Sequence, residues 1–229
     1  MALATLPLPR SKQTRRDEEA RAHLDDVARA AQPLVLARDR SVALGGALAE
    51  LVPDGAVVRG SVLRVAGAPG AGSTTVAFEL AAAFTALGEW AAAVDLDGTL
   101  GPLAAGEAGV ALERFAVVRR VPPARWATVV AALLEGVSLV VAEVPRGIGM
   151  GDARRLVARA RERESVLVVA ETQGTVWPAG AAFVVHAAGS VWDGLGCDAG
   201  FLTGRRLQVR VEGRGAAARP RIGELARAG

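Results

Sequence analysis

The sequence contains no tyrosine, and aromatic residues make up only 4% of its 229 residues. Proteins that bind single-stranded nucleic acid without sequence preference stack the bases on aromatic side chains. The shortage of such side chains therefore argues against a base-stacking platform. Lysine is nearly absent as well, because 26 of the 27 basic residues are arginines and only Lys12 is a lysine. The net charge of +3 is compatible with nucleic acid or an acidic partner and requires neither.

The single cysteine, Cys197, cannot form an internal disulfide, which is typical of a protein from a reducing compartment. The two histidines, His23 and His186, make no metal set or catalytic triad with it. No apolar stretch is long enough to span a bilayer, and residues 1–9 lack the pattern of a signal peptide. We therefore expect a cytoplasmic protein with no membrane partner.

A glycine-rich stretch lies between an apolar run and a long helical pattern, and it reads Gly67-Ala68-Pro69-Gly70-Ala71-Gly72-Ser73-Thr74. Strand, loop and helix form the context of a phosphate-binding P-loop, G-x-x-x-x-G-K-[ST], whose backbone N–H groups surround phosphates. Every fixed position matches except the lysine, which is Ser73. Because phosphoryl transfer depends on positioned charge, this loss predicts poor turnover. Two interpretations stay open, a purely structural loop and a loop with residual nucleotide affinity.

Apolar runs alternate with helical patterns along most of the chain. We expect strands at 62–66, 91–96, 115–121, 138–142, 166–170, 183–185 and 207–211. Near-continuous apolar strands alternating with helices predict an α/β fold with a mostly parallel central sheet, flanked by helices. Ligands bind at the carboxyl ends of the strands in such sheets. Trp177, in a short segment after the strand at 166–170, is the tryptophan that we expect to be exposed.

The chain divides into three expected regions. Residues 1–40 form a disordered leader and a charged N-terminal helix, residues 41–200 form the α/β core, and residues 201–229 supply the last strands of the core and an arginine-rich tail. The N-terminal helix, at about 14–31, presents Leu24 and Val27 on a narrow apolar stripe, so it packs on its own core, frays in solvent, or docks on a partner.

The arginine-rich stretch from residue 201 onward can bind phosphates bidentately, contact a protein partner, or be a solvated tail. The candidate contacts with a partner or DNA in this stretch are Arg205, Arg206, Arg214, Arg219 and Arg221.

Acidic residues follow two of the expected strands, Asp97 after 91–96 and Glu143 after 138–142. In P-loop ATPases one such acid orients Mg²⁺ and another polarises the attacking water. The order of these pieces resembles the RecA family, which has glutamate at the position of Asp97 and aspartate at that of Glu143. The resemblance implies a RecA-like P-loop core that has lost efficient hydrolysis.

We therefore expect no enzyme, no catalytic residue, no metal site, and no cofactor beyond weak binding of ATP with Mg²⁺. The degenerate nucleotide site is expected to comprise Gly67, Gly70, Gly72, Ser73, Thr74, Thr75, Asp97 and Glu143.

Between residues 42 and 164 the sequence most closely resembles the ImuA family in its actinobacterial form. The phrases that carry the likeness are Gly60-Ser61-Val62, Glu107-Ala108-Gly109-Val110-Ala111-Leu112-Glu113-Arg114 and Asp152-Ala153-Arg154-Arg155-Leu156. The resemblance implies a non-catalytic accessory protein of the mutasome that the SOS response to DNA damage induces, supporting error-prone translesion synthesis through protein contacts. It implies an ImuB-like polymerase homologue and an error-prone DnaE-type polymerase complex as partners, RecA as a further one, and leaves DNA contact open. The alternatives are a residual P-loop ATPase or nucleotide switch in DNA repair, and a SulA-like cell-division inhibitor.

Overall fold

The computed structural model describes residues 40–172, 174–194 and 200–228. The chain divides into two compact units, Met1–Arg40 and Ser41–Gly229, and the elements named below all belong to the second. The predicted helix at 14–31, with Leu24 and Val27, lies outside the described residues.

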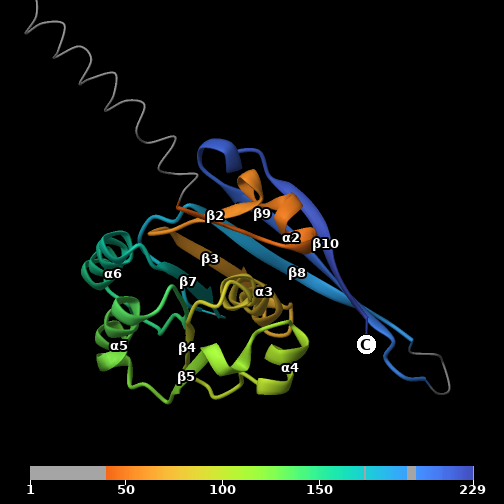
Figure 1. Cartoon of the computed structure of the whole chain (residues 1–229), viewed down its shortest axis with the longest axis horizontal. Helices are drawn as coiled ribbons and strands as arrows, with labels where there is room; N and C mark the ends of the chain where they lie inside the picture. The colour runs from red at the N-terminus through yellow and green to blue at the C-terminus, as the bar shows by residue number, and fades with distance from the viewer. Residues whose placement is uncertain (1–39, 173, 195–199, 229) are drawn as a thin grey trace, which may run out of the picture. The chain divides into compact units, whose positions relative to one another are not determined.

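The second unit is a mixed α/β fold (Figure 1). Its strands are β1 (Ser41–Ala43), β2 (Ala56–Val58), β3 (Val62–Gly67), β4 (Ala91–Asp95), β5 (Phe115–Arg119), β6 (Leu139–Glu143), β7 (Val166–Glu171), β8 (Phe183–Asp193), β9 (Gly204–Gly213) and β10 (Arg221–Ala228). Its helices are α2 (Gly46–Leu51), α3 (Ser73–Ala86), α4 (Pro102–Glu107), α5 (Pro123–Gly136) and α6 (Met150–Arg163), with 3-10 turns at Pro53–Gly55, Leu112–Arg114 and Gly215–Ala217. In the described part of the chain, none of the helices has the length and apolar character needed to cross a membrane.

Eight strands form the central sheet in the order β10-β9-β8-β3-β7-β6-β4-β5. Neighbouring strands from β8 through β5 run parallel, whereas β9 is antiparallel to both β8 and β10. The predicted α/β fold with a mostly parallel sheet flanked by helices is therefore confirmed. The stretch 201–229, expected to supply the last strands of the core and an arginine-rich tail, contains β9 and β10. Alternating apolar residues of β9, Leu207, Val209 and Val211, are buried in the core and explain this outcome.

The two faces of the sheet are covered by separate hydrophobic clusters. Alternation along β3 sends Leu63 and Val65 into one cluster and Val62 into the other. The first cluster includes Phe84 of α3, and the second includes Trp126 of α5, both at 1% exposure or less. Full burial of a large apolar side chain stabilises a fold by about 1.5–3 kcal/mol. Burial of such side chains therefore holds the helices against both faces of the sheet.

Trp177 is buried, contrary to the expectation that it would be exposed. It is 2% exposed, and its ring meets the ring of Trp126 edge to face at a centroid distance of 6.4 Å. The backbone N–H of Trp177 donates a 2.6 Å hydrogen bond to Glu171 at the end of β7. This bond and the aromatic contact hold the segment after β7 against the core. The prediction that Trp177 lies exposed in a short loop did not include these contacts.

Candidate functional site

A cavity of about 570 Å³ lies at the glycine-rich loop that joins β3 to α3. It opens at the carboxyl ends of the parallel strands, where ligands bind in open α/β sheets. The structure brings together in its wall all eight residues predicted for the degenerate nucleotide site, Gly67, Gly70, Gly72, Ser73, Thr74, Thr75, Asp97 and Glu143.

The loop has the backbone that its glycines permit. Gly70 has a φ of 77° and Gly72 a φ of 113°, both in the left-handed region where a side chain is strained. Gly72 is the N-cap of α3, which begins at Ser73 and runs for 14 residues. The first N–H groups of a helix have no partners within the helix, and the helix dipole makes this end partly positive. The loop therefore presents a positive end of a long helix to the cavity.

Ser73, in the position of the P-loop lysine, does not reach out as a lysine would. Its Oγ is buried, and among the described residues it has no hydrogen-bond partner. The hydroxyl lies against the end of β3, because a Cβ built on Gly67 would be only 2.7 Å from it. Ser73 therefore contributes to the cavity wall a buried hydroxyl that has no hydrogen-bond partner among the described residues. Unlike a lysine, it contributes no positive charge.

Glu143 is held by the backbone that follows β4. Its Oε2 accepts a 2.6 Å hydrogen bond from the N–H of Leu96 and a longer one, 3.4 Å, from the N–H of Asp97. Burial raises the pKa of Glu143 above its ordinary value, and the neighbouring carboxylates of Asp95 and Asp97 raise it further. The two backbone N–H groups oppose this rise. Asp97 itself is exposed at the edge of the cavity.

Asp95, the last residue of β4, is fully buried and serves the loop that follows it. Its Oδ1 accepts hydrogen bonds from the N–H groups of Gly98 and Thr99, and its Oδ2 accepts one from Leu100. The same carboxylate pairs with Arg119 of β5 at 3.3 Å. These partners assign Asp95 a structural role in shaping the edge of the cavity.

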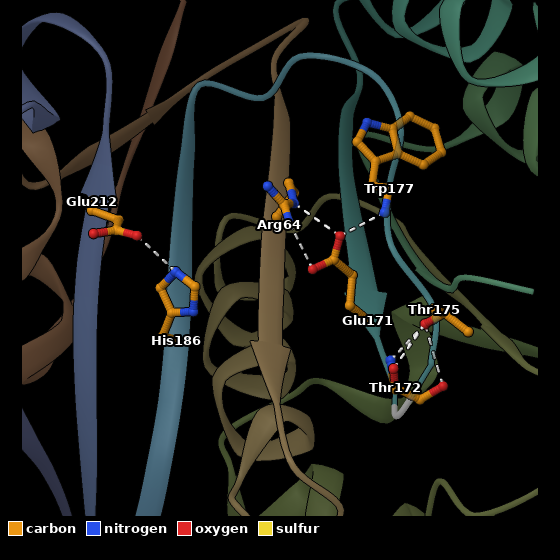
Figure 2. A network of polar contacts seen from close by, with 7 residues as sticks. All are labelled: Arg64, Glu171, Thr172, Thr175, Trp177, His186 and Glu212. Carbon is orange, nitrogen blue, oxygen red and sulfur yellow. Dashed lines mark hydrogen bonds and ion pairs between the residues drawn. The ribbon is translucent and has the colours of Figure 1, made fainter. Parts of the chain in front are cut away.

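Glu171, at the end of β7, is a cavity residue that the sequence analysis did not single out. Figure 2 shows Arg64 pointing from β3 toward it, with hydrogen bonds of 2.9 and 2.8 Å to its two carboxylate oxygens. One oxygen also accepts the N–H of Trp177. The sequence did contain a signal, because an arginine inside one apolar strand and a glutamate ending another suggest a buried pair.

Arg205 also lines the cavity. The sequence analysis predicted it instead as a candidate contact for a partner or DNA. It reaches the cavity from β9, where its Nη1 donates to Thr75 Oγ1 at 3.0 Å and its Nε donates to Ser190 Oγ at 2.8 Å. Its guanidinium lies over the ring of Trp192, 4.9 Å from the centroid. Strand β9 neighbours β3 only through β8, so the pairing of strands brings this arginine to the loop.

The other arginines proposed as contacts have different surroundings. Arg206 pairs with Asp193 at 3.0 Å, and Arg221 donates to the carbonyl of Val52 at 3.1 Å. Arg214 and Arg219 are exposed. The predicted arginine set is therefore divided between the cavity, a surface ion pair, the backbone after α2, and solvent.

The cavity combines the N-terminus of α3 and the guanidinium of Arg205 with carboxylates that mostly accept hydrogen bonds from the protein itself. This arrangement is suited to binding an anion. Within the described ranges, no three His, Cys, Asp or Glu side chains come together as they would around a metal ion.

A family model described as MT3502 N-terminal domain matches residues 50–179, which include the glycine-rich loop, Glu143 and Glu171. No curated protein matches the chain. The resemblance to the ImuA family is corrected by this match, because the family model that the chain fits is not an ImuA family. The phrases that suggested ImuA carry no catalytic signature, and in the structure they fall mainly in α4, α6 and the turns beside them.

Proposed function

This chain belongs to the family described as MT3502 N-terminal domain, and we propose that it is a P-loop-derived, RecA-like binding module that does not hydrolyse nucleotide. The arrangement of the site supports a RecA-like core. The strand before the loop, β3, lies inside the sheet between β7 and β8, and acids follow β4 and end β6 on the same edge. The loop keeps Gly70 and Gly72 in left-handed conformations, as a phosphate cradle requires.

The observation that carries the proposal is Ser73 in the place of the lysine. Phosphoryl transfer relies on positioned charges, and removal of one such stabilising group from an active site typically costs about 10²–10³ in rate. Glu143 adds to this effect, because its carboxylate is bonded to the N–H of Leu96 and has a raised pKa. A carboxylate held in this way is a weak ligand for Mg²⁺ or its water shell.

Phosphate release from Mg-ATP tests the proposal with the wild type, Ser73→Lys and Thr74→Ala. We expect no release by the wild type above a protein-free blank, and tighter binding of Mg-ATP by Ser73→Lys in calorimetry. Sustained release that scales with wild-type protein and disappears in Thr74→Ala would overturn the proposal in favour of a true ATPase or nucleotide switch.

The setting of the module in the damage-induced mutasome stays a prediction. This prediction was based on the resemblance to the ImuA family. We therefore propose a non-catalytic binding module, and its partners are a separate question for experiment. Capture by an ImuB-like polymerase homologue, a DnaE-type polymerase complex or RecA would support the expected role in translesion synthesis. Capture by the division apparatus instead would support the SulA-like alternative.

A further inference from the structure

Strand β5 forms one end of the central sheet (Figure 1), and in the part of the chain that the structure describes it pairs with β4 alone. The N–H of Arg120 donates to the carbonyl of Asp95 on β4. Because backbone groups alternate in direction along a strand, the N–H groups of Val117 and Arg119 point to the open side. The strand contains neither proline nor lysine, two residues that commonly protect an edge strand from pairing with another chain. The open side of β5 can therefore accept another strand.

An apolar hollow of about 170 Å³ lies beside β5. Its lining includes Phe78 of α3, whose ring meets the ring of Phe115 edge to face at a centroid distance of 6.2 Å. Val117 and Leu112 also line the hollow, and they are 38% and 45% exposed. Exposed apolar side chains gathered around a hollow are typical of a protein interaction site. The hollow can therefore bury an apolar side chain of a strand that adds to β5.

Arginines lie at both ends of β5. Arg114 directly precedes the strand and Arg120 directly follows it, and neither side chain has a hydrogen bond or ion pair with another described residue. The stretch 112–121 contains one further arginine, Arg119, which pairs with a buried carboxylate, and a single acidic residue, Glu113. Unpaired positive charge at both ends of the strand favours a partner with acidic residues on either side of its apolar residue.

We propose that the open edge of β5 binds an extended, acidic segment of a partner protein, which adds to the sheet as a strand and places an apolar side chain in the hollow. In this mode of binding the main-chain hydrogen bonds supply affinity, and the pocket beside the strand supplies specificity. Among the described residues, none of those that line the glycine-rich cavity comes from β5. The inference therefore goes beyond the proposed function and does not depend on whether the loop binds nucleotide.

Selection from a phage-displayed library of random linear peptides, with the immobilised full chain as the target, tests the proposal. We expect the enriched peptides to carry acidic residues on both sides of an apolar residue. One enriched peptide is synthesised with a fluorescent label, and its Kd is measured by fluorescence anisotropy. Val117→Pro removes an outward N–H of β5 and no bond to β4, so we expect at least about a tenfold rise in Kd. The matched control is Val117→Thr, which keeps the N–H and which we expect to stay within about threefold of the wild type.

The double variant Arg114→Glu with Arg120→Glu tests the role of charge, and it replaces Val117→Pro if that variant fails to fold. We expect at least about a tenfold rise in the Kd of the same peptide, because like charges then face each other. The matched control is Arg154→Glu with Arg161→Glu, two exposed arginines of α6, which packs against α5 and β7. We expect this control to stay within about twofold of the wild type.

Circular dichroism and thermal denaturation establish that each variant is folded. Equal affinity of the wild type, the folded Val117→Pro variant and the folded double variant at Arg114 and Arg120 would overturn the proposal. Failure of the library to yield peptides with acidic residues beside an apolar one would overturn it as well. Self-association of the wild type in analytical ultracentrifugation, abolished by Val117→Pro, would overturn it by assigning the edge of β5 to a second copy of the chain.

Discussion

Arg64 occupies the middle of β3, and its charge requires the partner that Glu171 provides. The side chain of Arg64 is 27% exposed and that of Glu171 only 7%, and the two share two hydrogen bonds. Glu171 also fixes the segment after β7 through the N–H of Trp177. This one carboxylate therefore links the strand before the glycine-rich loop to the strand beside it.

Removal of this carboxylate tests its structural role. We expect Glu171→Ala to lower the free energy of unfolding in urea by about 3 kcal/mol, because it leaves a half-buried arginine and a buried N–H without their acceptor. The control is Glu212→Ala on β9, whose partners His186 and Arg210 are more exposed, with an expected loss of less than about 1 kcal/mol. Similar losses for the two variants would contradict the assignment.

The raised pKa of Glu143 makes a prediction about pH. Because the pKa of Glu143 is raised in the folded protein, the stability contributed by this group is complete below its ordinary pKa of 4.5 and is lost as pH rises through the raised value. Glu143→Gln has no titratable group at this position. We expect the stability of Glu143→Gln relative to the wild type to increase with pH above 4.5, measured by urea denaturation across a pH series. A difference that does not change with pH would show that the folded pKa is not raised.

At the scale of elements, the turn from β3 into α3 depends on glycine at two places for different reasons. Gly70 and Gly72 both have positive φ, but a Cβ at Gly70 would meet nothing within 4 Å. At Gly72 it would lie 2.6 Å from Leu207 Cδ1, and Leu207 of β9 is buried in the core with 1% exposure. The loop and β9 are therefore in direct contact.

This contact predicts a difference between two glycine substitutions. Gly70→Ala meets only the backbone strain, about 1–3 kcal/mol, whereas Gly72→Ala adds an overpacking cost of about 1–3 kcal/mol. We expect Gly72→Ala to be less stable than Gly70→Ala by that added amount, measured by thermal or urea denaturation. Equal stability of the two variants would mean that β9 does not pack on the loop as the structure shows.

The parallel strands and their helices could be predicted from sequence because their apolar runs are continuous and local. The expected strand at 166–170 became β7 (Val166–Glu171), and the helical pattern after the loop became α3 (Ser73–Ala86). The antiparallel part was less evident. Only 183–185 of β8 was expected, because the second half of this strand has no continuous apolar run and none of its residues is buried. It is paired with β9.

At the scale of the whole molecule, the site is assembled from both sides of β3. The acids come from the segment after β4 and from β6 and β7, and Arg205 comes from β9 on the other side. The glycine-rich loop and its acids could be predicted, since the motif is local and strand ends share one edge of the sheet. Arg205 could not, because its contact with Thr75 spans 130 residues and depends on the order of the strands.

We propose that this P-loop-derived cavity does not hydrolyse nucleotide, and a single-turnover experiment tests this proposal. Trace ATP is incubated with Mg²⁺ and a large excess of the full chain for several hours, and the recovered nucleotide is separated by ion-exchange chromatography. We expect the nucleotide to be recovered as ATP, as in a sample without protein. Recovery as ADP with wild-type protein, and as ATP with Thr74→Ala, would contradict it and identify a working ATPase despite Ser73.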